Sequence, residues 1–485
     1  GSIHTYTSTD GGYSVGVAAL AFAGDASVTN SGDIDAVSNA SMYAGATGIT
    51  AFSGNGSTTV DNSGSVSATW TGYLYASARA IDAQGQQGVT VNNSGSLYAN
   101  GKYAYGVYAS SAAGDVVVNN AEAGEIGFYS YLNSGFGVLG VASAGDVGIS
   151  NAGTIEGYAF GQSAGVFALA LQGDAGVDNN GSINVVSGNG TAVGAFARAD
   201  YGTASVSNSG DITASDFTET GTYSGYAAFG ILARGTYAEV GNSGSITADG
   251  FVYGTGIAAA SLDGTTVVTT GGDINVSAEG ALVVQSYQGY YGTYYYYMLA
   301  GAAKGIDASS VYGDTTVSNA SNITATGGYV RAIGISATAY GDVDVSNTGD
   351  IDVAVRYAYD SYNATGIYAG DSGLPGYLFA EGTVSVSNSG DISIDSPMPG
   401  FGKAKGIDAV RYYGDVIVNN SGDIDIYAGG RSYGIFAMAT EGNASVVNTG
   451  DINMQSPSDA TIGLSAATGN FFFGGGDASV QNAGD

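Results

Sequence analysis

The repeat that decides the fold is clearest between residues 334 and 355, which read GISATAY (334–340), GDVDVSN (341–347) and TGDIDVAV (348–355). Apolar and polar residues alternate in each segment, and a period of two is typical of β-strands. Gly341 and Gly349 stand between the segments, and glycine is favoured in tight turns. The stretch therefore predicts three short strands joined by turns.

The same three-segment unit recurs along the chain, at spacings of about 26–32 residues. Its Gly-Ile or Gly-Val start returns at Gly48, Gly106, Gly137, Gly165, Gly230, Gly256, Gly305, Gly366, Gly406 and Gly434. Its Asn-x-Gly turn returns at Asn30, Asn62, Asn93, Asn208, Asn242, Asn347, Asn388, Asn420 and Asn448. With drifted copies included, such as the one at Thr270, the chain holds about fifteen repeats.

A single repeat has too few apolar side chains to offset the entropy of ordering its backbone, so neighbouring repeats must stack to share a core. The frequent glycines exclude helical repeats of similar length. The sequence therefore predicts an all-β fold, a right-handed parallel β-helix (β-solenoid) of about fifteen coils with three short strands per coil. We expect residues 1–485 to form one continuous segment, with loop insertions near residues 216–226, 281–303, 372–380 and 396–403.

The amino-acid composition excludes several kinds of protein and of binding site. The chain has 82 Gly and only 4 Pro, and its 44% hydrophobic content argues against disorder. The net charge of −31 excludes non-specific binding to nucleic acid, because the phosphates would be repelled. The absence of cysteine excludes disulfides and thiolate metal sites. No apolar run is long enough for a membrane span in this segment.

Strand parity predicts that the turn asparagines point inward at a corner of each coil, like Val343 and Val345 on the same strand. Stacked asparagine amides can hydrogen-bond from coil to coil, so we expect a structural ladder with no cofactor. Aspartates recur in the turn before the third segment, and Asp350, Asp391, Asp423 and Asp451 should stack on consecutive coils. Ca²⁺ could bridge such carboxylates, although capping of turns in contact with water is the simpler interpretation.

The few basic residues gather around the first segment of the repeat. Arg79, Lys304 and Lys405 come at its start, whereas Arg198 and Arg411 come after it. We expect these side chains to pair with nearby turn carboxylates along one edge of the solenoid. A stripe that binds acidic glycans is the alternative interpretation.

The 36 tyrosines suggest a contact surface, because tyrosine offers a large rigid area with a polar tip. Outward tyrosines are also ordinary residues of β-strands. The richest cluster falls in the largest insertion, and solenoids often bind partners through such loops. The candidate contact residues are Tyr287, Tyr290, Tyr291, Tyr294, Tyr295, Tyr296 and Tyr297.

Catalytic residues are sparse. The one histidine, His4, lies near the start of the chain, and no cysteine nucleophile or histidine pair accompanies it. Paired carboxylates such as Asp423 and Asp425 could cleave glycosidic bonds, but the same pair recurs in many repeats. We therefore expect no enzymatic activity, with a polysaccharide-acting enzyme as the least favoured alternative.

The repeats Gly-Ile-x-Ala, Gly-Asp-Val-x-Val-x-Asn and Asn-Ser-Gly-x-Ile resemble those of autotransporter passenger domains and related large bacterial surface adhesins. The resemblance covers nearly the whole chain and identifies no binding residues. It implies secretion, display outside the outer membrane on the bacterial cell surface, and adhesion. The partners expected from it are a host or neighbouring-cell surface, glycans, or the protein itself in self-association, as in a biofilm.

Both ends of the chain fall within the repeated turn, at Gly1-Ser2-Ile3 and at Asn482-Ala483-Gly484-Asp485. We expect the segment to be part of a longer array. The alternative function is a subunit of a self-assembling extracellular filament or sheath, in which coils of successive molecules stack.

Overall fold

The computed structural model describes residues 1–8, 12–39, 45–72, 77–217, 227–280, 282–289, 292–299, 301–357, 363–371, 381–397, 403–457, 459–469 and 476–484. For Asn363 and for residues 282–289 and 292–299 it describes the backbone only. The chain divides into two compact units. Unit 1 contains Gly1–Thr220 and Gly230–Thr236, and unit 2 contains Gly221–Phe229 and Tyr237–Asp485.

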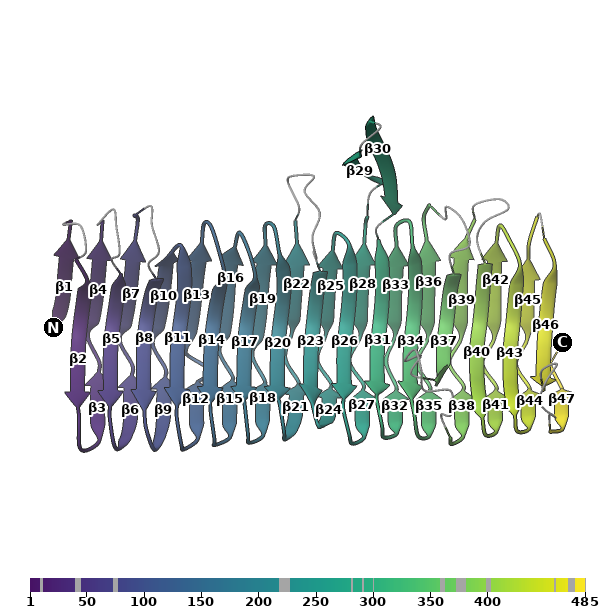
Figure 1. The fold of residues 1–485 in the computed structure, drawn as a ribbon, viewed down its shortest axis with the longest axis horizontal. Coiled ribbons are helices and arrows are strands. Elements are labelled where there is room, and N and C mark those ends of the chain that lie inside the picture. Colours follow the sequence, from purple (N-terminus) through teal and green to yellow (C-terminus); the bar gives the residue numbers. More distant parts are fainter. Residues whose placement is uncertain are drawn as a thin grey trace. The chain divides into compact units, whose positions relative to one another are not determined.

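Each unit is a parallel β-solenoid with three strands per coil. The chain passes from a strand of sheet B to one of sheet C, then to one of sheet A, and so into the next coil, as Figure 1 shows for β2, β3 and β4. Within each unit, the strands of sheets A, B and C pair in parallel with their equivalents in the neighbouring coils. The three segments of the sequence repeat, in their order from Gly334, are the strands of sheets B, C and A.

Sheet A of unit 1 consists of β1 (Ser2–Thr7), β4 (Asp33–Ser38), β7 (Ser65–Trp70), β10 (Ser96–Gly101), β13 (Glu125–Ser130), β16 (Thr154–Ala159), β19 (Ser182–Ser187) and β22 (Ile212–Asp216). Sheet A of unit 2 consists of β25 (Ile246–Gly250), β28 (Ile274–Ala278), β33 (Ile323–Gly327), β36 (Ile351–Val355), β39 (Ile392–Ser396), β42 (Ile424–Ala428) and β45 (Ile452–Gln455).

Sheet B of unit 1 consists of β2 (Ser14–Ala21), β5 (Ala46–Ser53), β8 (Ser77–Gly85), β11 (Tyr103–Ser111), β14 (Gly135–Ala142), β17 (Ser163–Ala170) and β20 (Thr191–Ala199). Strand β23 (Ala227–Gly235) has residues in both units. Sheet B of unit 2 consists of β26 (Tyr253–Ser261), β31 (Ala302–Ser310), β34 (Arg331–Ala339), β37 (Asn363–Asp371), β40 (Lys403–Tyr413), β43 (Ser432–Glu441) and β46 (Thr461–Thr468).

Sheet C of unit 1 consists of β3 (Ala26–Asn30), β6 (Ser57–Asn62), β9 (Gly88–Asn93), β12 (Val116–Asn120), β15 (Val147–Asn151), β18 (Ala175–Asn179) and β21 (Thr203–Asn208). Sheet C of unit 2 consists of β24 (Tyr237–Asn242), β27 (Thr266–Thr270), β32 (Thr315–Asn319), β35 (Val343–Asn347), β38 (Val384–Asn388), β41 (Val416–Asn420), β44 (Ala444–Asn448) and β47 (Ala478–Asn482).

The interior is built from rows of small aliphatic side chains. In sheet B of unit 1, Ile49, Ile81, Val107, Val138 and Val166 occupy one position on successive coils and are fully buried. Isoleucine, valine and alanine suit this position because β-branched and small residues pack well between closely spaced strands. The alternation seen in the sequence is therefore the alternation between core and outer face.

Glycine precedes four of these aliphatic residues, with Ala80 before Ile81 as the exception, and close packing favours it. A β-carbon at Gly106 would collide with the side chain of Ile126 and with the backbone carbonyl of Gly137 on the next coil. Gly137, Gly165 and Gly334 meet the same obstacles on their own coils. The Gly-Ile signature of the repeat thus marks the point where sheet B approaches sheet A most closely.

The predicted fold class is confirmed as an all-β parallel solenoid with three strands per coil. In the described residues, each of the three strand positions is occupied fifteen times over the two units together. No helix in this part of the chain has the length and apolar character needed to cross a membrane. That residues 1–485 form one continuous segment stays a prediction.

The insertions are described in part. The one near residues 281–303 contains β29 (Leu282–Gly289) and β30 (Gly292–Leu299), an antiparallel pair that forms a sheet of its own. Residues 218–226, 372–380 and 398–402 lie outside the described residues, and the other three predicted insertions fall mainly on them.

Candidate binding site

A groove crosses the outer face of sheet A in unit 1, over β10, β13 and β16. It has a volume of about 550 Å³. Strand alternation and parallel register place the outward residues in rows across the three strands, and one row is Tyr98, Gly127 and Glu156. The outward side chains that line the groove come from Ser96, Tyr98, Glu125, Tyr129, Thr154 and Glu156.

Gly127 forms the floor of the groove, because it is the one lining residue of its row without a side chain. The Cδ2 atom of Tyr98 lies 3.0 Å from the place that a β-carbon at Gly127 would take, so the edge of the tyrosine ring lies beside the bare backbone. On the inner face, the ring of Phe128 fills the space left by Gly157. The sheet here therefore carries aromatic rings on both faces.

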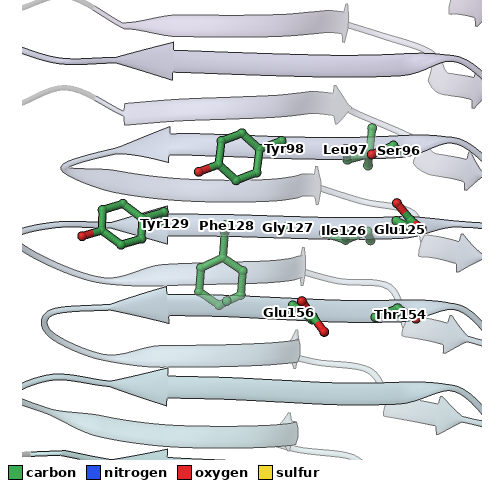
Figure 2. Close-up of a pocket in the computed structure, with 11 residues that line it drawn as sticks. Ser96, Leu97, Tyr98, Glu125, Ile126, Gly127, Phe128, Tyr129, Thr154 and Glu156 are labelled. Carbon is green, nitrogen blue, oxygen red and sulfur yellow. The ribbon is translucent and has the colours of Figure 1, made fainter.

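The tyrosines form a shelf along one side of the groove. Tyr129 stacks on Tyr158 of the next coil, with ring centroids 5.2 Å apart and 22° between the planes. Tyr98 and Tyr129 remain 43% and 42% exposed. Figure 2 shows their rings on the same face of the sheet, nearer the carboxyl ends of the strands than Glu125 and Thr154. Burial raises the pKa of Tyr98, and Tyr129 raises it further, so its phenol stays protonated.

Carboxylates and hydroxyls make up the rest of the lining. Glu125 and Glu156 are both exposed. Neither side chain receives a hydrogen bond from the described residues, so both keep their acceptor sites for a ligand. The Thr154 hydroxyl accepts a weak hydrogen bond from Ser182 at 3.4 Å. Among the residues that the structure describes, no lysine or arginine lines the groove. It therefore combines aromatic faces with oxygen acceptors.

The predicted tyrosine contact residues fall on the β29–β30 hairpin. The backbone places Tyr287 on β29 and Tyr294–Tyr297 on β30, with Tyr287 opposite Tyr294. Tyr290 and Tyr291 lie outside the described residues. The role of this cluster as a contact surface stays a prediction.

The turn asparagines form hydrogen-bonded ladders inside both units. In unit 1 the Nδ2 atom of Asn30 donates to Oδ1 of Asn62 at 2.8 Å, and the same bond joins each asparagine to the next. These bonds measure 2.7–2.8 Å and run through Asn62, Asn93, Asn120, Asn151, Asn179 and Asn208. Each Nδ2 also donates to a backbone carbonyl in its own turn, for example that of Gly64. The inward orientation expected from strand parity is the one observed.

Unit 2 has the same ladder with one substitution. Asn242 donates to the Thr270 hydroxyl at 3.2 Å, because threonine replaces asparagine in that coil. The amide ladder then continues from Asn319 through Asn347, Asn388, Asn420 and Asn448 to Asn482, with bonds of 2.6–2.8 Å. Because these amides bond each coil to the next, the ladder holds the coils together.

The predicted aspartate row does stack on consecutive coils of unit 2. An oxygen of Asp350 accepts the backbone N–H of Asp391 at 3.1 Å. Asp391 and Asp423 accept the N–H groups of Asp423 and Asp451 in the same way, at 2.9 Å each. No group of three or more histidine, cysteine, aspartate or glutamate side chains in the described part of the chain has the arrangement of a metal site. Binding of Ca²⁺ by Asp350, Asp391, Asp423 and Asp451 stays a prediction.

Five of the described basic residues pair with carboxylates, and one of these partners, Asp200, lies in a turn; the paired residues are Arg79, Arg198, Lys304, Lys405 and Arg411. Lys405 bonds Asp408 at 2.7 Å on the same strand, and Arg79 bonds Asp82 at 2.5 Å in the equivalent positions. Both cations also face aromatic rings on the next coil, with Lys405 4.7 Å from the ring centre of Phe436. The expected turn partners are therefore wrong for these pairs. Gly406 and Ile407 are both buried, so the alternation shifts there and brings Lys405 and Asp408 to the same side of the strand.

Arg411 differs most from its expected place at an edge, because it is fully buried. Its guanidinium donates to Asp371 at 3.1 Å and to the backbone carbonyls of Ala339, Tyr340, Gly341, Glu381 and Gly382. Burial lowers the pKa of Arg411 and raises that of Asp371, and the two charges partly offset both effects. Asp371 and Glu381 flank residues 372–380, so Arg411 holds the two sides of that insertion together.

Sequence reasoning missed the groove because its residues belong to three different repeats. The local signal was Gly127, a glycine at an outward strand position where most repeats have a polar side chain. His4, singled out for its chemistry, lies on β1 with Nδ1 3.7 Å from the exposed Asp35 carboxylate. Comparison with protein-family models, curated proteins and solved structures gives no match.

Proposed function

We propose that this chain is a structural and adhesive β-solenoid displayed outside a bacterial cell, of the kind found in autotransporter passengers. The observation that carries the proposal is the contrast between interior and surface. The interior repeats one aliphatic and asparagine pattern on almost every coil, whereas the outer faces differ from coil to coil. Such a scaffold holds varied surface residues at a fixed spacing of about 4.8 Å per coil.

The groove over β10, β13 and β16 supports the adhesive part of this role. Tyrosines with exposed rings are common where proteins meet partners, because they offer area at a low cost in conformational entropy. In this proposal the groove of unit 1 and the tyrosine-rich insertion of unit 2 are separate contact sites. The high negative charge keeps neighbouring copies soluble and apart.

The test is to display the 485-residue chain on a non-adherent bacterium and to measure attachment to epithelial cells and to sister cells under flow. Cells that carry an empty display anchor are the control. We expect displayed chain to increase attachment to one of the two surfaces. Equal attachment with and without the chain would contradict the adhesive function.

Electron microscopy of the purified chain separates this function from a filament or sheath. Short particles that do not lengthen with concentration agree with a displayed adhesin or stalk. Long uniform fibres would assign the chain to an extracellular filament instead.

A further inference from the structure

We propose that the groove over β10, β13 and β16 binds a neutral saccharide, a ligand class that rests on the proposed adhesive function. Tyr98 and Tyr129 present exposed aromatic rings on the same face of sheet A (Figure 2). The C–H groups on one face of a pyranose ring pack against such aromatic faces, through dispersion and weak C–H contacts. Gly127 leaves room for this by keeping the floor of the groove free of a side chain.

The oxygen acceptors lie where the hydroxyls of a stacked sugar would need them. Glu156 shares a row with Tyr98 and Gly127, and Glu125 stands at the amino end of the middle strand. An ionised carboxylate accepts strong, short hydrogen bonds from hydroxyl groups. Ser96 and Thr154 add hydroxyls that can donate as well as accept.

Charge decides which saccharides fit. Two carboxylates and no lysine or arginine line the groove, so uronic acids and sulfated sugars would be repelled. A cationic ligand would satisfy the carboxylates too, but acidic residues cover this protein generally, with 42 aspartates and glutamates. The tyrosine shelf and the bare Gly127 floor are what set this groove apart, and both suit an uncharged ring.

The test uses calorimetric titration of the purified 485-residue chain with hexasaccharides of glucose, mannose, galactose and xylose. A hexamer of galacturonic acid serves as the anionic ligand for comparison, and a hexamer of glucosamine serves as the cationic one. We expect at least one neutral hexasaccharide to bind, with little dependence on NaCl because no charges pair. Binding of none of the four, or binding of the glucosamine hexamer alone with steep salt dependence, would overturn the proposal.

Two matched pairs of variants test whether the saccharide binds in this groove. Gly127→Thr fills the floor and pushes on Tyr98, and we expect it to weaken binding about tenfold or more. Gly148→Thr is its control, because Gly148 is also an outward strand glycine but has open space around its β-carbon. Tyr129→Ala should weaken binding about tenfold as well, whereas Tyr427→Ala, 42% exposed on sheet A of unit 2, should not. Equal effects within either pair would reject the site.

The attachment assay and the sugar titration together distinguish this proposal from the proposed function. If displayed chain still mediates attachment while no neutral sugar binds, the ligand class is wrong and the adhesive function stands. If sugar binds in the groove while displayed chain mediates no attachment, the saccharide site stands and the adhesive function is wrong.

Discussion

Asparagine ends every sheet C strand except β27, which ends in Thr270, and its amide links one coil to the next inside both units. Asn420 accepts from Asn388 and donates to Asn448, with both bonds at 2.7 Å, and donates also to Gly422. An alanine there would leave buried donors and acceptors on three coils without partners. The cost of each such orphan is about 1–3 kcal/mol.

Asn420→Ala should therefore lower the free energy of unfolding by about 2–4 kcal/mol, measured by urea denaturation. Asn419→Ala is the matched control, because Asn419 is the preceding residue of β41 and points outward into solvent. Its loss should change stability by less than about 0.5 kcal/mol. Similar losses for the two variants would mean that the ladder contributes little.

Arg411 is a second residue on which stability depends, and for a different reason. Arg411→Met should destabilise unit 2 by about 3–5 kcal/mol, because it leaves the Asp371 carboxylate and five carbonyls without their donor. Arg198→Met removes an exposed pair with Asp200 and should cost less than about 1 kcal/mol. A small effect of Arg411→Met in urea denaturation would show that water replaces the guanidinium.

At the scale of elements, strands β8 and β40 of sheet B each carry an ion pair whose cation faces aromatic rings on the next coil. Lys405 and Asp408 on β40 face Tyr433 and Phe436 on β43. Burial raises the pKa of Asp408, and the nearby Lys405 offsets this only in part. The folded chain therefore binds a proton on Asp408 at a higher pH than the unfolded chain does.

The sign of the pH effect follows from this raised pKa. The ionised Asp408 costs stability at neutral pH, and this cost disappears as the pH falls from the raised pKa towards the ordinary carboxyl value. Unfolding in urea from about pH 7 to pH 4 should therefore show wild type gaining stability relative to Asp408→Asn as the pH falls. Parallel pH profiles for the two proteins would contradict this assignment.

The β29–β30 hairpin is the element with the greatest independence, since its two strands pair only with each other in the described sheets. Deleting Gln285–Tyr297 should leave the melting midpoint within about 2 °C of wild type, because the solenoid strands keep their partners. The same deletion should reduce attachment in the display assay. A hairpin with its tyrosines changed to serine separates loss of the side chains from loss of the loop, and unchanged attachment in both variants would remove the hairpin as a contact site.

The inward or outward direction of a side chain can be read from its own strand, whereas contacts between strands depend on their register. This difference explains which features the sequence could predict. The inward direction of Asn347 follows from Val343 and Val345 on the same strand, so fold class and ladder were both accessible. The groove needs Tyr98, Gly127 and Glu156 in one row, and only the observed register brings them there. Arg411 resembled an edge residue because nothing near it in sequence shows that five carbonyls from other segments surround it.

At the scale of the whole molecule, the net charge of −31 is the dominant electrostatic feature. Like charges repel along the chain, and added salt screens them over shorter distances. The melting midpoint should therefore rise between about 10 and 150 mM NaCl. CaCl₂ at equal ionic strength should raise it no further, since backbone amides already engage the aspartate row. A larger rise with CaCl₂, reversed by a chelator, would instead support metal bridging.

The ladder bonds all run in one sense, because each asparagine donates towards the coil that follows it in sequence. A duplicated stretch of about thirty residues, placed between two coils, would find an acceptor on one side and a donor on the other. Duplication of one repeat within the gene can thus lengthen such a protein without a change to its interior. The outward residues of the copies can then diverge. Duplication followed by divergence of the outward residues would produce coils with the same interior and different surfaces, as observed here.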